Sequence, residues 1–460
     1  MPHAHVVQAK RVVAPPPEVL PRTLTRTDLV LLGVGTVIGS GIFLVPAIVL
    51  REVDGSLGAA ALVWTVGGLL SLLGALTYGE LGAMKPDAGG LYVYIRDAFG
   101  PFVAFLYGWG LFFVIASGSL ATLMVAFATY LREFYPIGAL TSRAIVVAAL
   151  AAIAAVNVRG ARASADAQNW MTVAKVTAIV ALSVAFIVSG HGVAAANGHW
   201  WPSQVGRAAT GAGVSMVAVL WAFEGWQYVT FSAGETTDPQ RTFPSALATG
   251  TAAIVAIYLL ANVGYLAALG PSGMRAAERV ASQSADVSLG PWAAKAITIA
   301  ILLSIASAAN GLTLTAPRVY FAMARDGLFF QRLARIHPRF ETPAFAIVSS
   351  SVWAAVLAIS GTFEQLLTYV VFSAWIFYAL GAAALFYYRR AEPDMRRPFR
   401  VPGYPVTPAV FILSALAVVI STLISQPGRA AVGLGILLAG TPAYAIWRRR
   451  RINAVQRSMP

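Results

Sequence analysis

The sequence predicts an all-α integral membrane protein of about twelve transmembrane helices, and three observations lead to this fold class. Of the 460 residues, 58% are hydrophobic and only 11% are charged, whereas soluble domains contain roughly 25% charged residues. Apolar runs of about 20 residues, the length that crosses a bilayer, recur along the chain. Basic residues gather in the short segments between these runs. Lipid is therefore the expected environment of most of the surface.

The apolar runs define one transmembrane domain over residues 28–447, between an N-terminal tail (1–27) and a C-terminal tail (448–460). The third and eighth runs are long enough to tilt strongly or to project into a loop. Residues 271–290 are expected to form the longest external loop. We place the spans near residues 28–50, 57–80, 98–131, 143–158, 169–190, 210–233, 244–270, 291–323, 344–361, 365–388, 406–425 and 430–447.

The distribution of basic residues orients the spans. With an even number of spans both tails lie on one side, and Lys and Arg mark that side as cytoplasmic. Of the 33 basic residues, 23 lie in the tails and even-numbered loops and 8 in the odd-numbered loops and nearby span ends. The N-terminal tail lacks an apolar core, so we do not expect a cleavable signal peptide. We expect a multi-pass plasma membrane protein with both termini in the cytoplasm.

Composition also excludes several classes of function. The net charge of +14 does not indicate nucleic acid, because the basic residues are scattered through loops and do not form a basic face. The chain has no cysteine, which excludes disulfides, thiolate metal sites and cysteine nucleophiles. Its five histidines fall in tails or loops, so an enzyme site within the bilayer is not expected. We expect no cofactor and no metal site.

Glycine residues cluster in the first span. Four glycines fall within residues 33–41 of the stretch GVGTVIGSGIF, and Pro46 follows. A glycine in a helix costs roughly 1 kcal/mol and a proline about 3 kcal/mol, so the cluster predicts an unwound turn at Gly39-Ser40-Gly41. N–H groups freed at the positive end of the next half-helix suit a carboxylate, and a free Val37 carbonyl suits an ammonium group. The alternative is that the glycines only allow close helix packing.

An acidic residue lies in the middle of the sixth span. Glu224 stands in WAFEGW, residues 221–226, and a carboxylate at that depth costs about 3 kcal/mol unless it is protonated, paired or open to water. Gly225 permits a second helix break, which Trp221 and Phe223 would flank as bulky lids over a small solute. Lipid or helix packing is the alternative for the aromatic residues. A structural hydrogen bond is the alternative for Glu224.

The two interrupted spans indicate an internal symmetry. Only the first and sixth spans are interrupted near mid-membrane by polar or glycine-rich residues. Spans five apart have opposite topology, so this spacing favours inverted five-helix repeats. We place the repeats near residues 28–190 and 210–388, with two extra helices over residues 406–447.

Two further spans contain polar residues of interest. Lys175 lies near the predicted start of the fifth span, where it either snorkels to the interface or points inward to the carbonyls freed by the first break. Ser304 and Ser307 share one face of the eighth span with Gly311, at spacings of three and four residues. That face either packs against the first helix or lines a path for solute.

Four motifs together resemble the amino acid–polyamine–organocation superfamily. They are GSGIF (39–43), PDAGGLY (86–92), ETTDPQRTFP (235–244) and RRPFRVPGYP (396–405). Within that superfamily the chain is most similar to the L-type amino acid transporter family and its bacterial relatives, over residues 24–447. The resemblance implies twelve helices with inverted repeats, alternating access and an amino acid substrate.

The resemblance also assigns roles to matching residues. Ser40 and Gly41, with Gly39 beside them, match the turn that binds the substrate carboxylate, and Val37 matches the carbonyl that binds its amine. Trp221 matches the aromatic gate, and Lys175 the lysine at the sodium position of sodium-independent members. Glu224 departs from animal L-type members, which have a small residue there, and is similar to bacterial ones with an acid. The expected substrate-binding residues are Val37, Ile38, Gly39, Ser40, Gly41, Trp221, Ala222, Phe223 and Glu224, with Tyr92, Ser304 and Ser307 as weaker matches.

Animal members of this branch bond to a heavy-chain glycoprotein through a cysteine in the external loop after the third helix. The corresponding loop here, residues 132–143, has none. We therefore expect a bacterial inner-membrane protein that works without a disulfide-linked partner.

The leading function is sodium-independent amino acid transport by exchange or proton coupling. A sodium symporter, or a carrier of polyamines or other cationic solutes on the same fold, is the first alternative. A membrane-embedded enzyme, sensor or channel is a more distant one. The identity of the amino acid, the direction of transport, the oligomeric state and the role of Glu224 stay open.

Overall fold

The computed structural model describes residues 20–458 apart from 133, 135, 197–199 and 361–362. This part of the chain is built from helices and turns, contains no β-strand, and has one isolated bridge between Leu24 and Thr236. The N-terminal half contains α1 (Arg26–Val37), η1 (Gly41–Phe43), α2 (Val45–Glu52), α3 (Leu57–Met84), α4 (Leu91–Phe99), α5 (Pro101–Gly110), η2 (Leu111–Ile115), α6 (Ala116–Leu131), α7 (Ala139–Val158), α8 (Ala161–Ser189), η3 (Val193–Ala196) and α9 (Val205–Ala222). The C-terminal half contains η4 (Trp226–Glu235), α10 (Pro239–Ala276), α11 (Val280–Leu289), α12 (Pro291–Thr315), α13 (Pro317–Arg325), η5 (Gln331–Ala334), α14 (Ala344–Ser360), α15 (Phe363–Ala391), α16 (Val406–Ser425), α17 (Pro427–Leu438) and α18 (Gly440–Ser458).

Ten helical segments of the described chain are long and apolar enough to cross a membrane. A shorter apolar helix, α14, has 17 residues. The first predicted span is divided into α1, with 12 residues, and α2, with 8, and neither half reaches the roughly 20 residues of a full crossing. The all-α membrane class is therefore confirmed, and the first span is interrupted as its glycines predict.

Local sequence determines where several helices begin. Thr25 and Asp28 form a reciprocal capping box at the start of α1, which satisfies two N–H groups that the helix leaves free. Helices α5, α10, α12, α13 and α17 have proline in their first turn, where its missing N–H is harmless.

Three predicted segments differ from the structure. Helix α8 begins at Ala161, eight residues before the predicted span, because the polar Ser164 and Gln168 in its first turns are buried against protein and not against lipid. Much of the predicted external loop 271–290 is the helix α11, in which Val280, Ala281 and Ala285 are buried. The predicted C-terminal tail continues α18 as far as Ser458.

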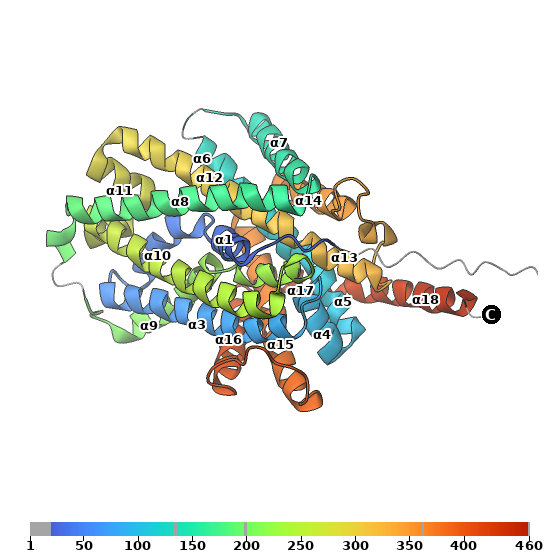
Figure 1. Ribbon diagram of the computed structural model, residues 1–460. Coiled ribbons are helices and arrows are strands. Elements are labelled where there is room, and N and C mark those ends of the chain that lie inside the picture. The colour runs from blue at the N-terminus through green and yellow to red at the C-terminus, as the bar shows by residue number, and fades with distance from the viewer. Residues whose placement is uncertain (1–19, 133, 135, 197–199, 361–362, 459–460) are drawn as a thin grey trace, which may run out of the picture.

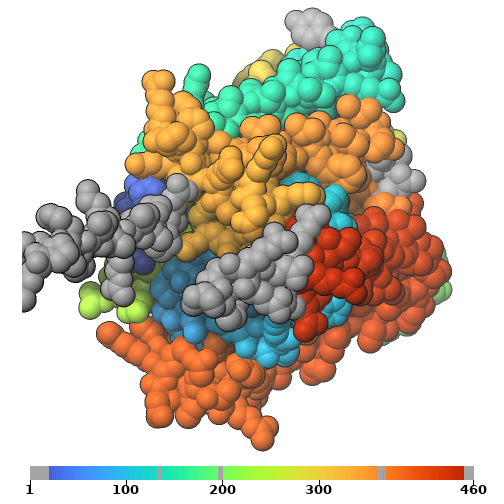
Figure 2. Space-filling model, turned by 90° about the vertical axis from the view of Figure 1, so that its right-hand side faces the viewer, coloured from blue at the N-terminus to red at the C-terminus, as the bar shows by residue number. Residues whose placement is uncertain are grey.

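The two halves of the first span lie inside the bundle. Figure 1 shows α1 between α8 and α10, and α1 also contacts α12. Helix α18 lies at the surface beside α5 (Figure 2), where Tyr444 and Trp447 pack on Phe105. The broken helix is thus enclosed by long continuous helices, which can hold its ends in place.

Candidate functional site

The first helix is broken where glycine predicts it. Helix α1 ends at Val37, Ile38 leaves the helical conformation with φ −75° and ψ 86°, and α2 starts at Val45. The turn is held from the eighth span, because Ser304 Oγ donates to the Ile38 carbonyl at 2.9 Å and to the Gly39 carbonyl at 3.2 Å. The N–H groups of Ser40 and Gly41 have no partner among the described backbone and side chains.

Lys175 lies at the end of α1. Its side chain is 1% exposed, and Nζ donates to the carbonyls of Gly35 and Ile38 at 2.6 Å each and of Ser304 at 3.3 Å. It is in the middle of α8, since this helix begins at Ala161. The geometry therefore matches the inward orientation and excludes the alternative of snorkelling to the interface.

The sixth span is broken beside the first. Helix α9 ends at Ala222, and Gly225 has φ 133°, a conformation that a side chain would strain. A Cβ on Gly225 would lie 3.0 Å from the backbone nitrogen of Val37, and one on Gly41 would lie 2.8 Å from Cβ of Ala222. The two breaks therefore touch, and both glycines are required by the close approach.

Tyr258 of α10 joins the two breaks. Its hydroxyl lies 2.9 Å from the Ala222 carbonyl and 3.2 Å from the Val37 carbonyl, both of which accept its hydrogen bond. The Val37 carbonyl also accepts the Gly39 N–H at 2.8 Å, whereas the Ala222 carbonyl keeps a second lone pair for another donor.

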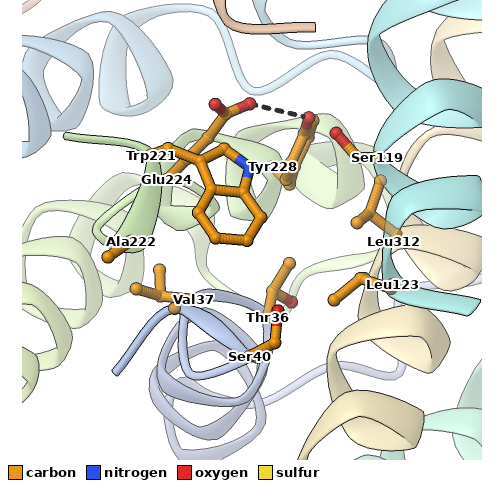
Figure 3. Close-up of a pocket in the computed structure, with 12 residues that line it drawn as sticks. Thr36, Val37, Ser40, Ser119, Leu123, Trp221, Ala222, Glu224, Tyr228 and Leu312 are labelled. Carbon is orange, nitrogen blue, oxygen red and sulfur yellow. Dashed lines mark hydrogen bonds between the residues drawn. The ribbon is translucent and has the colours of Figure 1, made fainter. Parts of the chain in front are cut away.

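A pocket lies between the breaks, and its unfilled space, including the part that is open to solvent, is about 410 Å³. Figure 3 shows Trp221 and Glu224 on one side of it and Thr36, Val37 and Ser40 on the other. The hydroxyl of Ser40 is buried and has no partner among the described residues. The lining residues are Thr36, Val37, Gly39, Ser40, Gly41, Ser119, Leu123, Trp221, Ala222, Glu224, Tyr228 and Leu312.

Glu224, a lining residue of this pocket, has one carboxylate oxygen without a hydrogen-bond partner in the described chain. Its Oε1 accepts hydrogen bonds from the hydroxyls of Tyr378 at 2.9 Å and Tyr228 at 3.3 Å. Its Oε2 is shielded from solvent and has no partner in the described chain. Gln227 donates to Tyr378 at 2.5 Å, so the tyrosine hydroxyl is oriented to donate to the carboxylate. A buried acceptor without a donor costs roughly 1 to 3 kcal/mol, which a ligand donor would recover.

The structure brings only some of the sequence-predicted residues into the pocket. Ile38 contributes its carbonyl to Lys175, and Ser304 supports the turn from behind. Phe223 packs away from the pocket, with its ring 5.8 Å from that of Trp64 and 5.0 Å from that of Tyr258. Ser307 is buried outside the lining. Tyr92 donates to Asp326 at 2.8 Å. Seven predicted residues line the pocket: Val37, Gly39, Ser40, Gly41, Trp221, Ala222 and Glu224.

Sequence reasoning missed five lining residues. Thr36 is the residue before Val37, the last residue of α1, and Tyr228 follows Glu224 by four residues. The two predicted breaks could therefore have indicated both. Ser119, Leu123 and Leu312 lie on α6 and α12, in stretches with many similar small or apolar residues. Only the spacing of four between Ser119 and Leu123, which places them on one helix face, marks them in the sequence.

No group of three or more His, Cys, Asp or Glu residues in the described chain could hold a metal ion. The cations nearest the breaks belong to protein side chains. Arg318 pairs with Glu235 at 2.5 and 2.9 Å, with both side chains fully buried. The Glu235 carbonyl also accepts the N–H groups of Thr23 at 2.8 Å and Leu24 at 2.9 Å, so one end of the bundle is closed by a polar cluster.

Replacing Lys175 with alanine should destabilise the fold. The change leaves the buried Gly35 carbonyl without its lysine donor and the Ile38 carbonyl with Ser304 alone, and we expect a loss of about 2 kcal/mol in the free energy of unfolding. The measurement is the melting temperature in detergent, with Lys295→Ala, which removes an exposed lysine of α12, as the matched control. Equal melting temperatures for the two variants would contradict a structural role of the Lys175 ammonium.

The chain is similar to known amino acid transporters over most of its length. The family model for amino acid permeases matches residues 24–441. The human cystine/glutamate transporter is 31% identical over 440 residues, covering 94% of this chain and 87% of its own. The serine/threonine exchanger SteT of Bacillus subtilis is 30% identical over 425 residues, with 91% and 95% coverage. The mouse b(0,+)-type amino acid transporter 1 is 30% identical over 401 residues, with 86% and 81% coverage.

A family match over most of the chain and relatives at this identity and coverage lead to one conclusion. The chain belongs to the amino acid permease family, within the amino acid–polyamine–organocation superfamily.

Proposed function

We propose that this protein transports amino acids across the plasma membrane by alternating access, without sodium. The observation that carries the proposal is the pocket between the two helix breaks. Its lining residues have free N–H groups at Ser40 and Gly41, a carbonyl with a free lone pair at Ala222 and a carboxylate with one unpaired oxygen at Glu224. These groups are complementary to an amino acid backbone at one end and to its side chain at the other. Membership of a transporter family supports the same function.

The substrate carboxylate binds at the turn of the first span. The N–H groups of Ser40 and Gly41 lack partners, and the Ser40 hydroxyl is buried without one. A helix N-terminus such as the start of η1 and α2 also favours negative charge. The substrate amine lies against the Ala222 carbonyl, which accepts the Tyr258 hydroxyl and keeps a second lone pair. The neighbouring Val37 carbonyl already accepts the Tyr258 hydroxyl and the Gly39 N–H.

Lys175 replaces sodium in this proposal. Its ammonium group contacts three backbone carbonyls, as a coordinated cation would, and it is fixed covalently to α8. A second cation at the same carbonyls would meet it as a like charge in a medium of low dielectric. Transport is therefore driven by exchange or by a proton, and the exchanger SteT supports exchange first.

The span count and the repeats also belong to the proposal. Twelve crossings result if α1 with α2 counts as the first and α14 as the ninth, in addition to the ten long segments. The breaks then fall in the first and sixth crossings, as inverted repeats of residues 28–190 and 210–388 require. The protein works without a disulfide-linked heavy chain, because it has no cysteine.

A polyamine or another solute without a carboxylate is the second candidate, and Glu224 is the observation in its favour. Such a solute would leave the Ser40 and Gly41 N–H groups and the Ser40 hydroxyl without a partner in a closed pocket. Because these unpaired donors would cost free energy, an amino acid fits the pocket better than a solute without a carboxylate.

Transport is tested by uptake in proteoliposomes loaded with unlabelled amino acids. We expect accumulation of at least one of four radiolabelled probes, L-arginine, L-lysine, L-serine and L-leucine, at equal rates in sodium and choline buffers. Uptake that disappears in choline would show a sodium symporter. Absence of uptake for all four probes and for the remaining common amino acids in a competition panel would refute the proposed function.

Glu224 selects the substrate side chain. Since its Oε2 lacks a donor, a side chain that donates a hydrogen bond, cationic or hydroxyl, should bind better than an aliphatic one. Glu224→Gln should lower kcat/KM for the preferred polar probe by about tenfold, in line with roughly 1.5 kcal/mol or more for a hydrogen bond to a charged group. L-Leucine uptake should change less. An equal effect on all four probes would assign Glu224 a structural role only.

Both termini lie in the cytoplasm in this proposal, on the side where 23 of the 33 basic residues gather. Because the chain has no cysteine, the labelling of a single introduced cysteine shows on which side of the membrane that residue lies. A membrane-impermeant maleimide should label Gln283→Cys on α11 in intact cells and should label Arg400→Cys, between α15 and α16, only after lysis. The reverse pattern would invert the orientation.

A further inference from the structure

A second, larger cavity lies outside the central pocket. It is bounded by α2 and α9 on one side and by α15 and α16 on the other, and its unfilled space, including the open mouth, is about 870 Å³. Val217 and Ala218 of its lining stand four residues before Trp221 and Ala222, which line the central pocket. The cavity therefore lies one helical turn away from the central pocket, toward the start of α9.

Helices α2 and α9, which form one wall of the cavity, are closely packed against each other. A Cβ on Gly211 of α9 would lie 1.9 Å from the Glu52 carbonyl at the end of α2, so the two helices are in direct backbone contact there. In η1, four residues before α2 begins, Gly41 also lies close to Ala222 at the end of α9. These two close contacts lead us to expect that α2 and α9 move together and that such a movement changes the width of the cavity.

Glu52 gives this wall an unpaired negative charge. The carboxylate is exposed at the cavity mouth, and no described residue donates to it. Its basic neighbours are engaged elsewhere, because Arg51 donates to the carbonyls of Arg275 and Ala277 at 3.2 and 3.1 Å, and Arg275 pairs with Asp54 at 3.2 Å. The end of α2 adds the negative pole of its helix dipole.

The opposite wall presents hydrogen-bond donors. Gln426 Oε1 accepts from Thr368 Oγ1 and from Arg429 Nη1, each at 3.0 Å, and these bonds orient the amide so that its two N–H groups remain for another acceptor. Ser425 lies beside it at the mouth, while Ser215 and Thr422 form a buried polar floor. The positive Arg429 behind Gln426 favours an anionic group at this wall.

We infer that this cavity is an outer binding site for a zwitterionic amino acid, whose ammonium group pairs with Glu52 and whose carboxylate accepts from Gln426. The inference rests on the proposed function for the class of its ligand. A molecule held there separates α2 and α9 from α15 and α16, so its departure is required before the cavity can narrow. The outer site thus loads the transporter and delays its closure.

The test is the number of amino acids bound per protein in lipid nanodiscs, measured by scintillation proximity with the four radiolabelled probes of the uptake assay. The wild type should bind two molecules of a transported probe, one of them more weakly. Glu52→Gln should weaken that second component by at least about tenfold, the effect of losing one charge-assisted pair. Glu278→Gln, which removes another exposed acid outside the cavity, should leave both components unchanged.

A cysteine at the mouth gives an independent measurement. In an otherwise wild-type chain, Ser425→Cys should react with a maleimide more slowly when the transported probe is present, at concentrations that fill the weaker component. A stoichiometry of one bound amino acid per protein would overturn the outer site. The outer site would also be overturned if Glu52→Gln left both binding components unaltered and the probe did not slow the maleimide reaction of Ser425→Cys. Sodium-independent uptake in the same preparation would then still uphold the proposed function, whereas two-site binding without any uptake would refute that function and keep the outer site.

Discussion

The contact between the Lys175 ammonium and the end of α1 is the interaction on which the site depends. A helix that stops inside a membrane protein leaves carbonyls without donors, and each costs free energy there. A buried lysine has the complementary problem of a charge without a counter-ion. The three carbonyls that Nζ reaches are matched in number by the three protons of the ammonium group. Each group thus removes the penalty of the other, and the break becomes a stable part of the fold.

The second break depends on the first for steric reasons. Gly225 can approach Val37, and Gly41 can approach Ala222, only because neither glycine has a side chain. Tyr258 then bridges the carbonyls on the two sides. Since α1 is fixed to α8 and α12 through Lys175 and Ser304, the sixth span inherits its position from the same contact. The pocket is therefore the place where two interrupted helices face each other across a fixed junction.

The opposite end of these helices is coupled by the backbone of the N-terminal segment. Thr237 donates to the Leu24 carbonyl at 2.9 Å, and the Glu235 carbonyl accepts from Thr23 and Leu24. The start of α1 and the end of η4 consequently form one unit, which Arg318 holds to the eighth span through a buried ion pair. A buried pair contributes little net stability but is costly to break on one side, so it suits a contact that must separate as a whole when this end opens.

The sequence predicted the membrane class, most of the span positions and both helix breaks, because each has a local cause in apolar length or in glycine. It also located seven of the pocket residues, since these lie at the breaks. The position of Lys175 within its helix was misjudged, because the polar first turns of α8 are buried against Asn310 and its neighbours. A search for apolar runs does not detect polar residues that are buried against another helix. Phe223 faces Trp64 and not the pocket for a similar reason: its direction is decided by the twist of the break. Ser119 and Leu312 come from other helices, and only tertiary packing brings them near.

The two ends of the pocket are fixed by different parts of the fold, and this separates general from selective recognition. The turn at Ser40 and Gly41 is held by α8 and α12, and it presents only backbone groups and one hydroxyl. In the proposed function this turn would recognise what all amino acids share. Glu224 is held by Tyr378 of α15, whose own carbonyl accepts the Tyr78 hydroxyl at 3.1 Å. In the proposed function, a substrate that contacts both the turn and Glu224 would link the helices that hold them, α12 and α15. A side chain that donates to the free oxygen of Glu224 would complete this link, whereas a shorter or apolar one would leave the carboxylate unpaired and the closed state of the proposed transport cycle less stable.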